Sequence, residues 1–121
     1  MALSKTEEQL MQYLWRLEKA FMKDLLDAYP DPKPATTTIA TLLKRMIGKG
    51  YVAYVTYGKS REYYPLVKKD VYSSRQVNGL IKTFFNDSAS QFASFFTSNS
   101  NLSKSELEDL KCLIDQELKK K

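Results

Sequence analysis

The stretch "ATTTIATLLKRM", residues 35–46, predicts the element on which both fold and function depend. It opens with three β-branched threonines, which are poor residues for a helix interior, yet its apolar residues recur at helical spacing. At about 100° per residue, one side of the helix is apolar: Ile39, Leu42, Leu43, Met46 and Ile47. The opposite side carries Thr37, Ala40, Thr41, Lys44 and Gly48, with Arg45 beside them. We therefore expect a helix over about 36–48 whose outer face is small, hydroxylic and basic.

Two further helices are expected before this stretch. Ser4 followed by Glu7 is a capping box, and apolar residues at three- and four-residue steps predict a first helix over 4–18. The same spacing predicts a second helix over about 20–29. "PDPKPA" ends that helix, because proline cannot continue it. Thr36 follows the proline-rich loop and is the expected N-cap of the third helix.

A β-hairpin is expected after the third helix. "GKG" ends that helix, with Gly50 as its left-handed cap residue. The segments "YVAYVTY" (51–57) and "REYYPL" (61–66) are rich in β-branched and aromatic residues and are joined by "GKS", so they predict two paired strands. Three helices and a basic hairpin are the order of a winged helix-turn-helix. The predicted fold is mainly α with a small β-hairpin, and residues 1–69 form its winged-helix domain.

The remaining residues, 70–121, predict a helical dimerisation domain. Helices are expected over 70–86 and 88–97, and a second capping box, Ser103 with Glu106, opens a final helix. A region this short leaves apolar surface uncovered, and a second copy of the chain would cover it. The alternative, in which these helices fold back onto the same chain, stays open. The expected interface residues are Val77, Leu80, Ile81, Phe84, Phe85, Phe92, Phe96, Leu107, Leu110 and Ile114.

Composition excludes several function classes. Histidine is absent and Cys112 is the single cysteine, so the common zinc sites and histidine-dependent catalytic triads are impossible. The four glycines match no nucleotide-binding motif. We therefore expect neither an enzyme nor a bound metal or cofactor. With no signal peptide and no apolar run near about 18 residues, we expect a cytoplasmic chain without direct membrane insertion.

The excess of basic residues lies in the first part of the chain. Residues 1–69 contain 12 Lys and Arg against 7 Asp and Glu, a net charge of +5, whereas residues 70–121 contain 7 of each. Such asymmetry favours a surface that meets a polyanion, although a solvated basic face without a partner is the plain alternative. The hydroxyls and cations of the third helix make double-stranded DNA the expected partner.

The expected contacts follow from how helix-turn-helix proteins bind. The N-terminal part of the recognition helix enters the major groove, and the wing lies against the neighbouring minor groove or its phosphates. We expect Thr37 and Thr41 to contact the groove and Thr38 its edge or the backbone. The recognition-helix set is Thr36, Thr37, Thr38, Thr41, Lys44 and Arg45, and the wing set is Lys59, Ser60 and Arg61. Two alternatives remain: an adaptor that binds an acidic protein, and a tyrosine platform for single strands.

Four segments resemble one known family. "LSKTEEQLMQYLW" (3–15), "TIATLLKRMIGKGYV" (38–52), "YYPLV" (63–67) and "LSKSELEDLKCLI" (102–114) are similar to the penicillinase and methicillin-resistance repressors, the BlaI/MecI family. The resemblance implies a homodimeric winged-helix repressor of palindromic operators, such as those of beta-lactamase-type resistance genes. It also implies release when a membrane sensor protease triggers cleavage in the dimerisation domain.

Two positions depart from the family pattern. Ala40 stands on the recognition helix where members of the family carry a basic residue, which changes the operator sequence to be expected. The family cleavage bond, usually Asn-Phe, falls on Phe95–Phe96, so this pair marks the expected cleavage region. Proteolytic release at that bond, at another bond, or not at all are the alternatives that follow.

Overall fold

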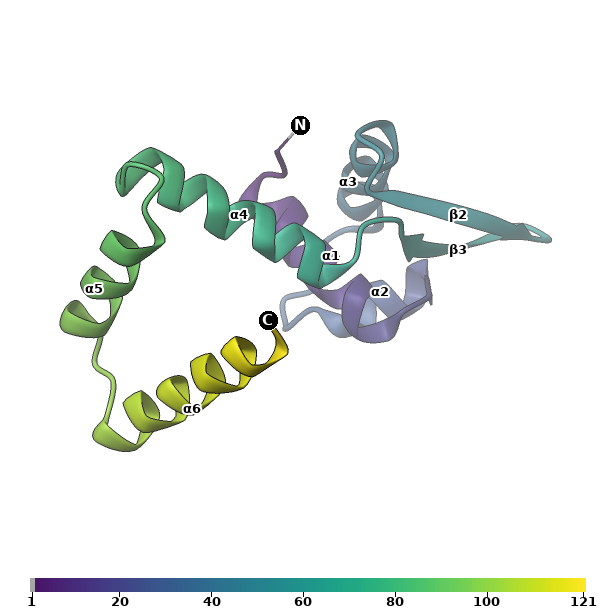
Figure 1. Cartoon of the computed structure of the whole chain (residues 1–121). Coiled ribbons are helices and arrows are strands. Elements are labelled where there is room, and N and C mark those ends of the chain that lie inside the picture. Colours follow the sequence, from purple (N-terminus) through teal and green to yellow (C-terminus); the bar gives the residue numbers. More distant parts are fainter. Residues whose placement is uncertain (1) are drawn as a thin grey trace. The chain divides into compact units, whose positions relative to one another are not determined.

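The computed structural model describes residues 2–121, and Figure 1 shows its helices and strands. In chain order they are α1 (Lys5–Leu17), β1 (Ala20–Phe21), α2 (Met22–Ala28), α3 (Thr36–Gly48), β2 (Val52–Tyr57), β3 (Ser60–Pro65), α4 (Lys69–Phe84), α5 (Ala89–Asn99) and α6 (Lys104–Lys120). They belong to two compact units. The first ends at Ser73, and the second runs from Ser74 to Lys121.

The predicted capping box sets the start of α1. The Ser4 amide donates to Glu7 Oε1 at 2.8 Å, and the Glu7 amide donates to Ser4 Oγ at 3.2 Å. Both donors would otherwise lack a partner at the helix start, so each bond favours a helix that begins there. The helix ends at Glu18, whose backbone is left-handed with φ 69°. The expectation of a helix over 4–18 is confirmed to within one residue at each end.

The expectation of a second helix from residue 20 is wrong at its start. Ala20 and Phe21 form β1, which pairs with β3 through Ala20 opposite Tyr63 and Phe21 opposite Glu62. The expected two-stranded hairpin is therefore part of a three-stranded antiparallel sheet with the order β1-β3-β2. Local spacing did not reveal β1, because a two-residue strand exists only through its pairing with a distant segment.

The β2–β3 hairpin extends away from the three helices of its unit (Figure 1). Its register places Val52 opposite Pro65 and Tyr57 opposite Ser60, so the turn has two residues, Gly58 and Lys59. Gly58 has φ 60° while Lys59 is outside the left-handed region, as in a type II′ turn. This turn matches the twist of the strands and presents Lys59 at the tip.

A single apolar core fixes the orientation of α3. Its inner residues are fully buried together with side chains of α1, α2 and β2. The largest fully buried apolar side chains are Leu10, Met11, Leu14, Leu25, Ile39, Leu43, Met46 and Val52. Fully burying each such side chain contributes about 1.5–3 kcal/mol. Rotating α3 about its axis would expose its apolar residues to water and lose this contribution, and burying the polar outer face would not replace it. The outer face of α3 is consequently held toward solvent.

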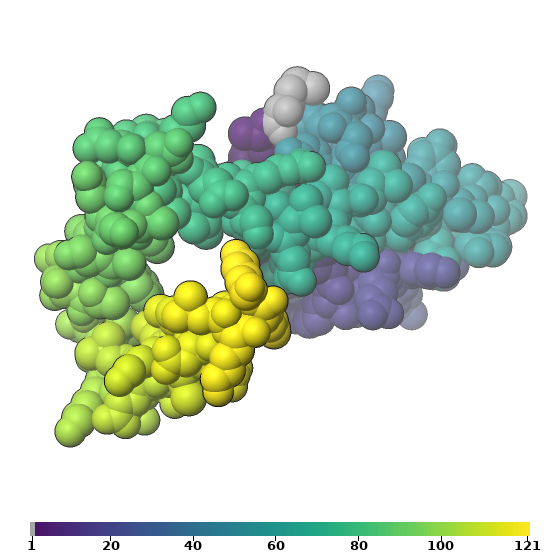
Figure 2. Space-filling model, in the orientation of Figure 1, coloured from purple at the N-terminus to yellow at the C-terminus, as the bar shows by residue number. Residues whose placement is uncertain are grey.

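The second unit has no comparable core. The structure describes all of residues 74–121, and none of them is buried. Phe85 contacts the rings of Phe92 and Phe95 at 5.5 and 5.4 Å, but Phe84 is 72% exposed. In the space-filling view, the atoms of α6 are drawn in yellow and yellow-green (Figure 2). The second predicted capping box is present, since Ser103 and Glu106 exchange bonds of 3.1 Å.

Candidate nucleic-acid interface

The outer face of α3 has the composition that the sequence predicted. The residues expected to meet DNA there are all exposed: Thr36, Thr37, Thr38, Thr41, Lys44 and Arg45. Ala40, between them, is exposed as well. None of these side chains is large and apolar, so packing this face against a protein would bury little apolar surface. It offers hydroxyls, methyl groups and two cations to a partner.

Thr36 is not the N-cap of α3, as the sequence suggested. Ala35 occupies that position with extended geometry and forms no side-chain capping bond, while Thr36 is already helical. The Ala35 carbonyl accepts from the amides of Thr38 and Ile39. Within the described residues, the amides of Thr36 and Thr37 have no partner. Two free amides and the positive end of the helix dipole make this end of α3 suited to an anion.

The hydroxyl of Thr41 is already used inside α3. It donates to the Thr37 carbonyl at 2.9 Å. Its proton is therefore committed, and Thr41 presents its methyl group and the lone pairs of its oxygen. Such a side chain can contact a thymine methyl group or accept from a base amino group. It cannot donate to a phosphate without losing the bond to Thr37.

The hairpin brings a preoriented arginine next to α3. Lys59, Ser60 and Arg61 are all exposed, and the Arg61 guanidinium lies 4.4 Å from the centre of the Tyr54 ring. A cation at this distance is attracted by the aromatic face, which restricts the motion of the guanidinium. Tyr54 is directly opposite Tyr63, two residues from Arg61, so the contact is a diagonal one on one sheet face.

Arg61 and Lys44 line the same groove between α3 and the hairpin. The groove has a volume of about 480 Å³, and Ala40 and Tyr54 also line it. The small side chain of Ala40 leaves this space open. Two cations from separate elements thus face one groove wide enough for a phosphate group. Sequence reasoning missed the part of Tyr54, although cross-strand spacing carried the signal.

A buried ion pair holds the C-terminal end of α3. Glu7, whose side chain is 2% exposed, accepts from Lys49 Nζ at 2.8 Å, and Lys49 also donates to the Ala2 carbonyl at 3.1 Å. Lys49 is the C-cap of α3, so the pair ties the end of α3 to the start of α1. Burial raises the pKa of Glu7, but bonds from Lys49 and Ser4 outweigh it and leave the pKa below its ordinary value. Sequence reasoning gave no sign of this pair, because Glu7 and Lys49 lie far apart in the chain.

The residues expected at a dimer interface present apolar surface to solvent. Val77, Leu80, Phe84, Phe96, Leu107 and Ile114 are exposed, whereas Ile81, Phe85, Phe92 and Leu110 are half-buried. Leu107, Leu110 and Ile114 share one side of α6. The expected cleavage bond, Phe95–Phe96, lies inside α5 with both side chains exposed. Its backbone is helical, which is not the extended form that proteases bind.

Two negative observations apply to residues 2–121. No group of three or more His, Cys, Asp or Glu side chains in that range is placed to hold a metal ion. No helix in the same range is both long and apolar enough to cross a membrane.

Comparisons with known proteins agree with this architecture. The sequence profile described as penicillinase repressor matches residues 3–116. No curated protein sequence matches the chain. The crystal structure of a cysteine-to-serine mutant of MarR from E. coli is similar, with 12% identity, a TM-score of 0.51, and 96% of this chain and 78% of that chain covered. The oxidised form of E. coli MarR is similar too, with 13% identity, a TM-score of 0.51, and 96% and 76% covered.

At such identities the two structures establish the fold alone, a winged helix, whereas the profile spans nearly the entire sequence. The family and fold are those of transcriptional regulators. The chain therefore belongs to the penicillinase repressor family and is a DNA-binding transcriptional regulator.

Proposed function

We propose that this chain is a homodimeric repressor that binds a palindromic operator, with residues 1–69 contacting DNA and residues 70–121 forming the dimer. The observation that carries the proposal is the outer face of α3, where hydroxyls and cations are exposed while Ile39, Leu43 and Met46 anchor the helix from behind. This face suits the major groove better than a protein surface, because it lacks apolar anchors. It disfavours the adaptor alternative for the same reason.

Each part of the interface has a distinct role in the proposal. The free amides of Thr36 and Thr37 bind a phosphate at the start of α3, which sets the entry of the helix into the groove. Thr37 and Thr41 contact base edges, and Thr38 contacts the edge of the groove. Lys44 and Arg61 neutralise a phosphate at the groove that they share. Arg45 reaches a second phosphate or a guanine edge, while Lys59 and Ser60 follow the minor groove.

Dimerisation supplies the second half-site. The exposed apolar side chains of α4, α5 and α6 need a cover, and the zero net charge of residues 70–121 removes long-range repulsion between two copies. Two copies related by a twofold axis present two α3 helices at a fixed spacing. They therefore read a palindrome.

The proposed physiological role follows the family. The protein acts in the cytoplasm, represses beta-lactamase-type resistance genes, and is released through a membrane sensor protease. Cleavage at Phe95–Phe96 would require α5 to unwind locally, since the bond lies in its interior. The absence of a core around α5 lowers the cost of that unwinding.

The DNA interface is tested by selecting bound duplexes from a random pool and then measuring affinity against salt. With the selected duplex, log affinity should fall by about 0.9 per phosphate neutralised. Lys44→Ala with Arg45→Ala removes four cations from a dimer, so the salt slope should become shallower, by at most about 3.6. Lys119→Ala with Lys120→Ala removes the same charge from the end of α6 and should leave the slope unchanged. A slope that is the same for both pairs would contradict the assignment.

The dimer interface is tested with two variants that add one negative charge each. Ile114, 60% exposed, lies on the side of α6 that carries Leu107 and Leu110, and Gln116 lies about 160° from it. Ile114→Glu should give a monomer at concentrations where the parent chain is a dimer, measured by analytical ultracentrifugation. Gln116→Glu should leave the dimer intact. Equal effects would show that α6 does not pack through this side.

A further inference from the structure

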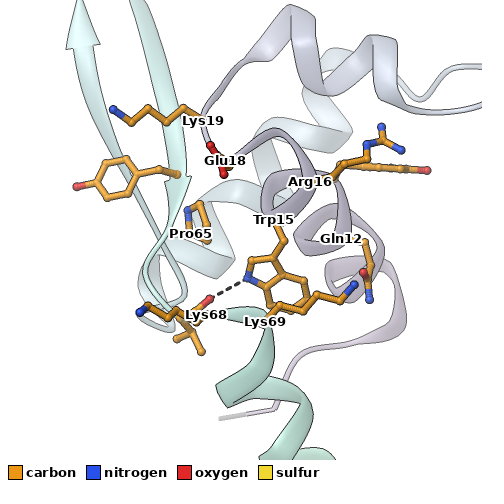
Figure 3. A pocket seen from close by; sticks show the side chains of 11 residues that line it. Gln12, Trp15, Arg16, Glu18, Lys19, Pro65, Lys68 and Lys69 are labelled. Atoms are coloured by element: carbon orange, nitrogen blue, oxygen red, sulfur yellow. Dashed lines mark hydrogen bonds between the residues drawn. The ribbon is translucent and has the colours of Figure 1, made fainter. Parts of the chain in front are cut away.

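A groove of about 690 Å³ lies in the first unit, apart from the proposed DNA-binding residues. It runs along the C-terminal half of α1, past the end of β3, to the residues that lead into α4 (Figure 3). No residue of α3 and none of the hairpin tip lines it. Its volume is in the range of small-molecule sites, which is about 300–1,000 Å³.

The floor of the groove is aromatic and held in place. The indole of Trp15 donates from Nε1 to the Val67 carbonyl at 2.8 Å, the bond drawn in Figure 3. Its ring also packs against buried Tyr72, with 5.7 Å between the ring centres. Because its one donor is satisfied, the indole offers a ligand an apolar surface and no hydrogen bond. Pro65 and Val67 extend this apolar surface.

The rim of the groove is strongly basic. Arg16, Lys19, Lys68 and Lys69 line it together with one carboxylate, Glu18, which gives a local net charge of +3. Within residues 2–121, none of the four cations forms a salt bridge. Figure 3 shows Lys68 and Lys69 beside Trp15, whereas Arg16 points away from the indole, with its guanidinium 5.3 Å from the centre of the Tyr13 ring. Four cations without a carboxylate partner around a fixed aromatic floor complement a molecule that is itself apolar and anionic.

We propose that this groove is a binding site for a small organic anion, with a flat apolar body over Trp15 and a carboxylate or phosphate held by Lys68 or Lys69. The site is separate from DNA binding, because α3 and the hairpin tip do not contribute to it. An acidic peptide or the DNA backbone would use the cations but would not need the apolar floor.

The single tryptophan gives a direct test in the full-length chain. Its indole N–H produces one cross-peak in a ¹⁵N–¹H correlation spectrum, and a ring bound over it shifts that peak. Titration with 1-naphthoate should shift the peak saturably, with a dissociation constant of about 1 mM or below. Acetate, which has the charge alone, and 1-naphthalenemethanol, which has the ring alone, should bind at least about tenfold more weakly.

Matched variants assign the binding to the rim. Lys68→Gln with Lys69→Gln should weaken naphthoate binding about tenfold, whereas Lys119→Gln with Lys120→Gln should leave it unchanged. The same spectra show whether each variant is folded. The proposal is overturned if the shift does not saturate, if the neutral alcohol binds equally well, or if both variant pairs lose affinity alike. Displacement of naphthoate by duplex DNA or by an acidic peptide that binds more tightly would also overturn it, by assigning the groove to that partner.

Discussion

Removing either partner of the Glu7–Lys49 pair should destabilise the first unit, but by unequal amounts. The two side chains differ in access to water: Glu7 is 2% exposed and Lys49 is 23% exposed. In addition, Glu7 Oε2 is buried and has no hydrogen-bond partner among the described residues. A charge left behind on Glu7 therefore has less access to water than a charge left on Lys49.

The magnitudes follow from that asymmetry. Lys49→Met leaves an uncompensated buried carboxylate and should cost about 3–5 kcal/mol of unfolding free energy. Glu7→Gln keeps an oxygen for the Ser4 amide and for Lys49, whose ammonium can turn to water, so it should cost about 1–2 kcal/mol. The double variant Glu7→Gln with Lys49→Met leaves no buried charge and should cost less than the two single changes together.

Urea unfolding followed by Trp15 fluorescence measures these costs, because the chain has one tryptophan and it lies in the first unit. For a domain of this size the urea slope is about 1 kcal/mol per molar, so the single variants should differ by about 2 M in midpoint. Protein concentration is kept constant, since the proposed dimerisation would contribute to stability. If Lys49→Met is unfolded without urea, trimethylamine N-oxide restores a measurable transition. Equal costs, or a larger cost for Glu7→Gln, would refute the reasoning.

Three further outcomes are expected in the same assay. Because the pKa of Glu7 is lowered on folding, its charge stabilises the fold above the ordinary value of 4.5, and this stabilisation is lost as pH falls further. Glu7→Gln should remove that part of the acid dependence, and an unchanged pH profile would contradict the role of the pair. The hydroxyl of Tyr29 is buried without a partner among the described residues, so Tyr29→Phe should be neutral or stabilising by up to about 1 kcal/mol. A clear loss of stability would reveal a partner for that hydroxyl. Glu18 has φ 69°, and Glu18→Gly should raise the urea midpoint by about 1 M, whereas Glu18→Ala should not.

Local sequence signals predicted the elements that depend on neighbouring residues. The apolar spacing of Ile39, Leu43 and Met46 defined the inner face of α3, and the two capping boxes, which begin at Ser4 and Ser103, set the starts of α1 and α6. In each case the determining contacts lie within four residues along the chain, so the sequence alone contains them.

Features that depend on distant residues could not be predicted in this way. β1 exists because Ala20 pairs with Tyr63, and Lys49 is half-buried because the fold brings it to Glu7. Thr36 has the residue type that N-caps prefer, but the backbone becomes helical one residue earlier than the threonine run suggests. Pairing and burial across the chain decide the first two of these features.

The unequal cores of the two units bear on how the proposed repressor would be switched off. The first unit buries its own core, so α3 and the hairpin stay ordered in a single chain. The second unit buries no residue, so in the proposed dimer its order would depend on association and therefore on concentration. Two linked half-sites bind far more tightly than one, because the second contact is made within the complex. On the proposed function, unwinding or cutting α5 would remove that linkage and release DNA while each DNA-binding unit remained folded.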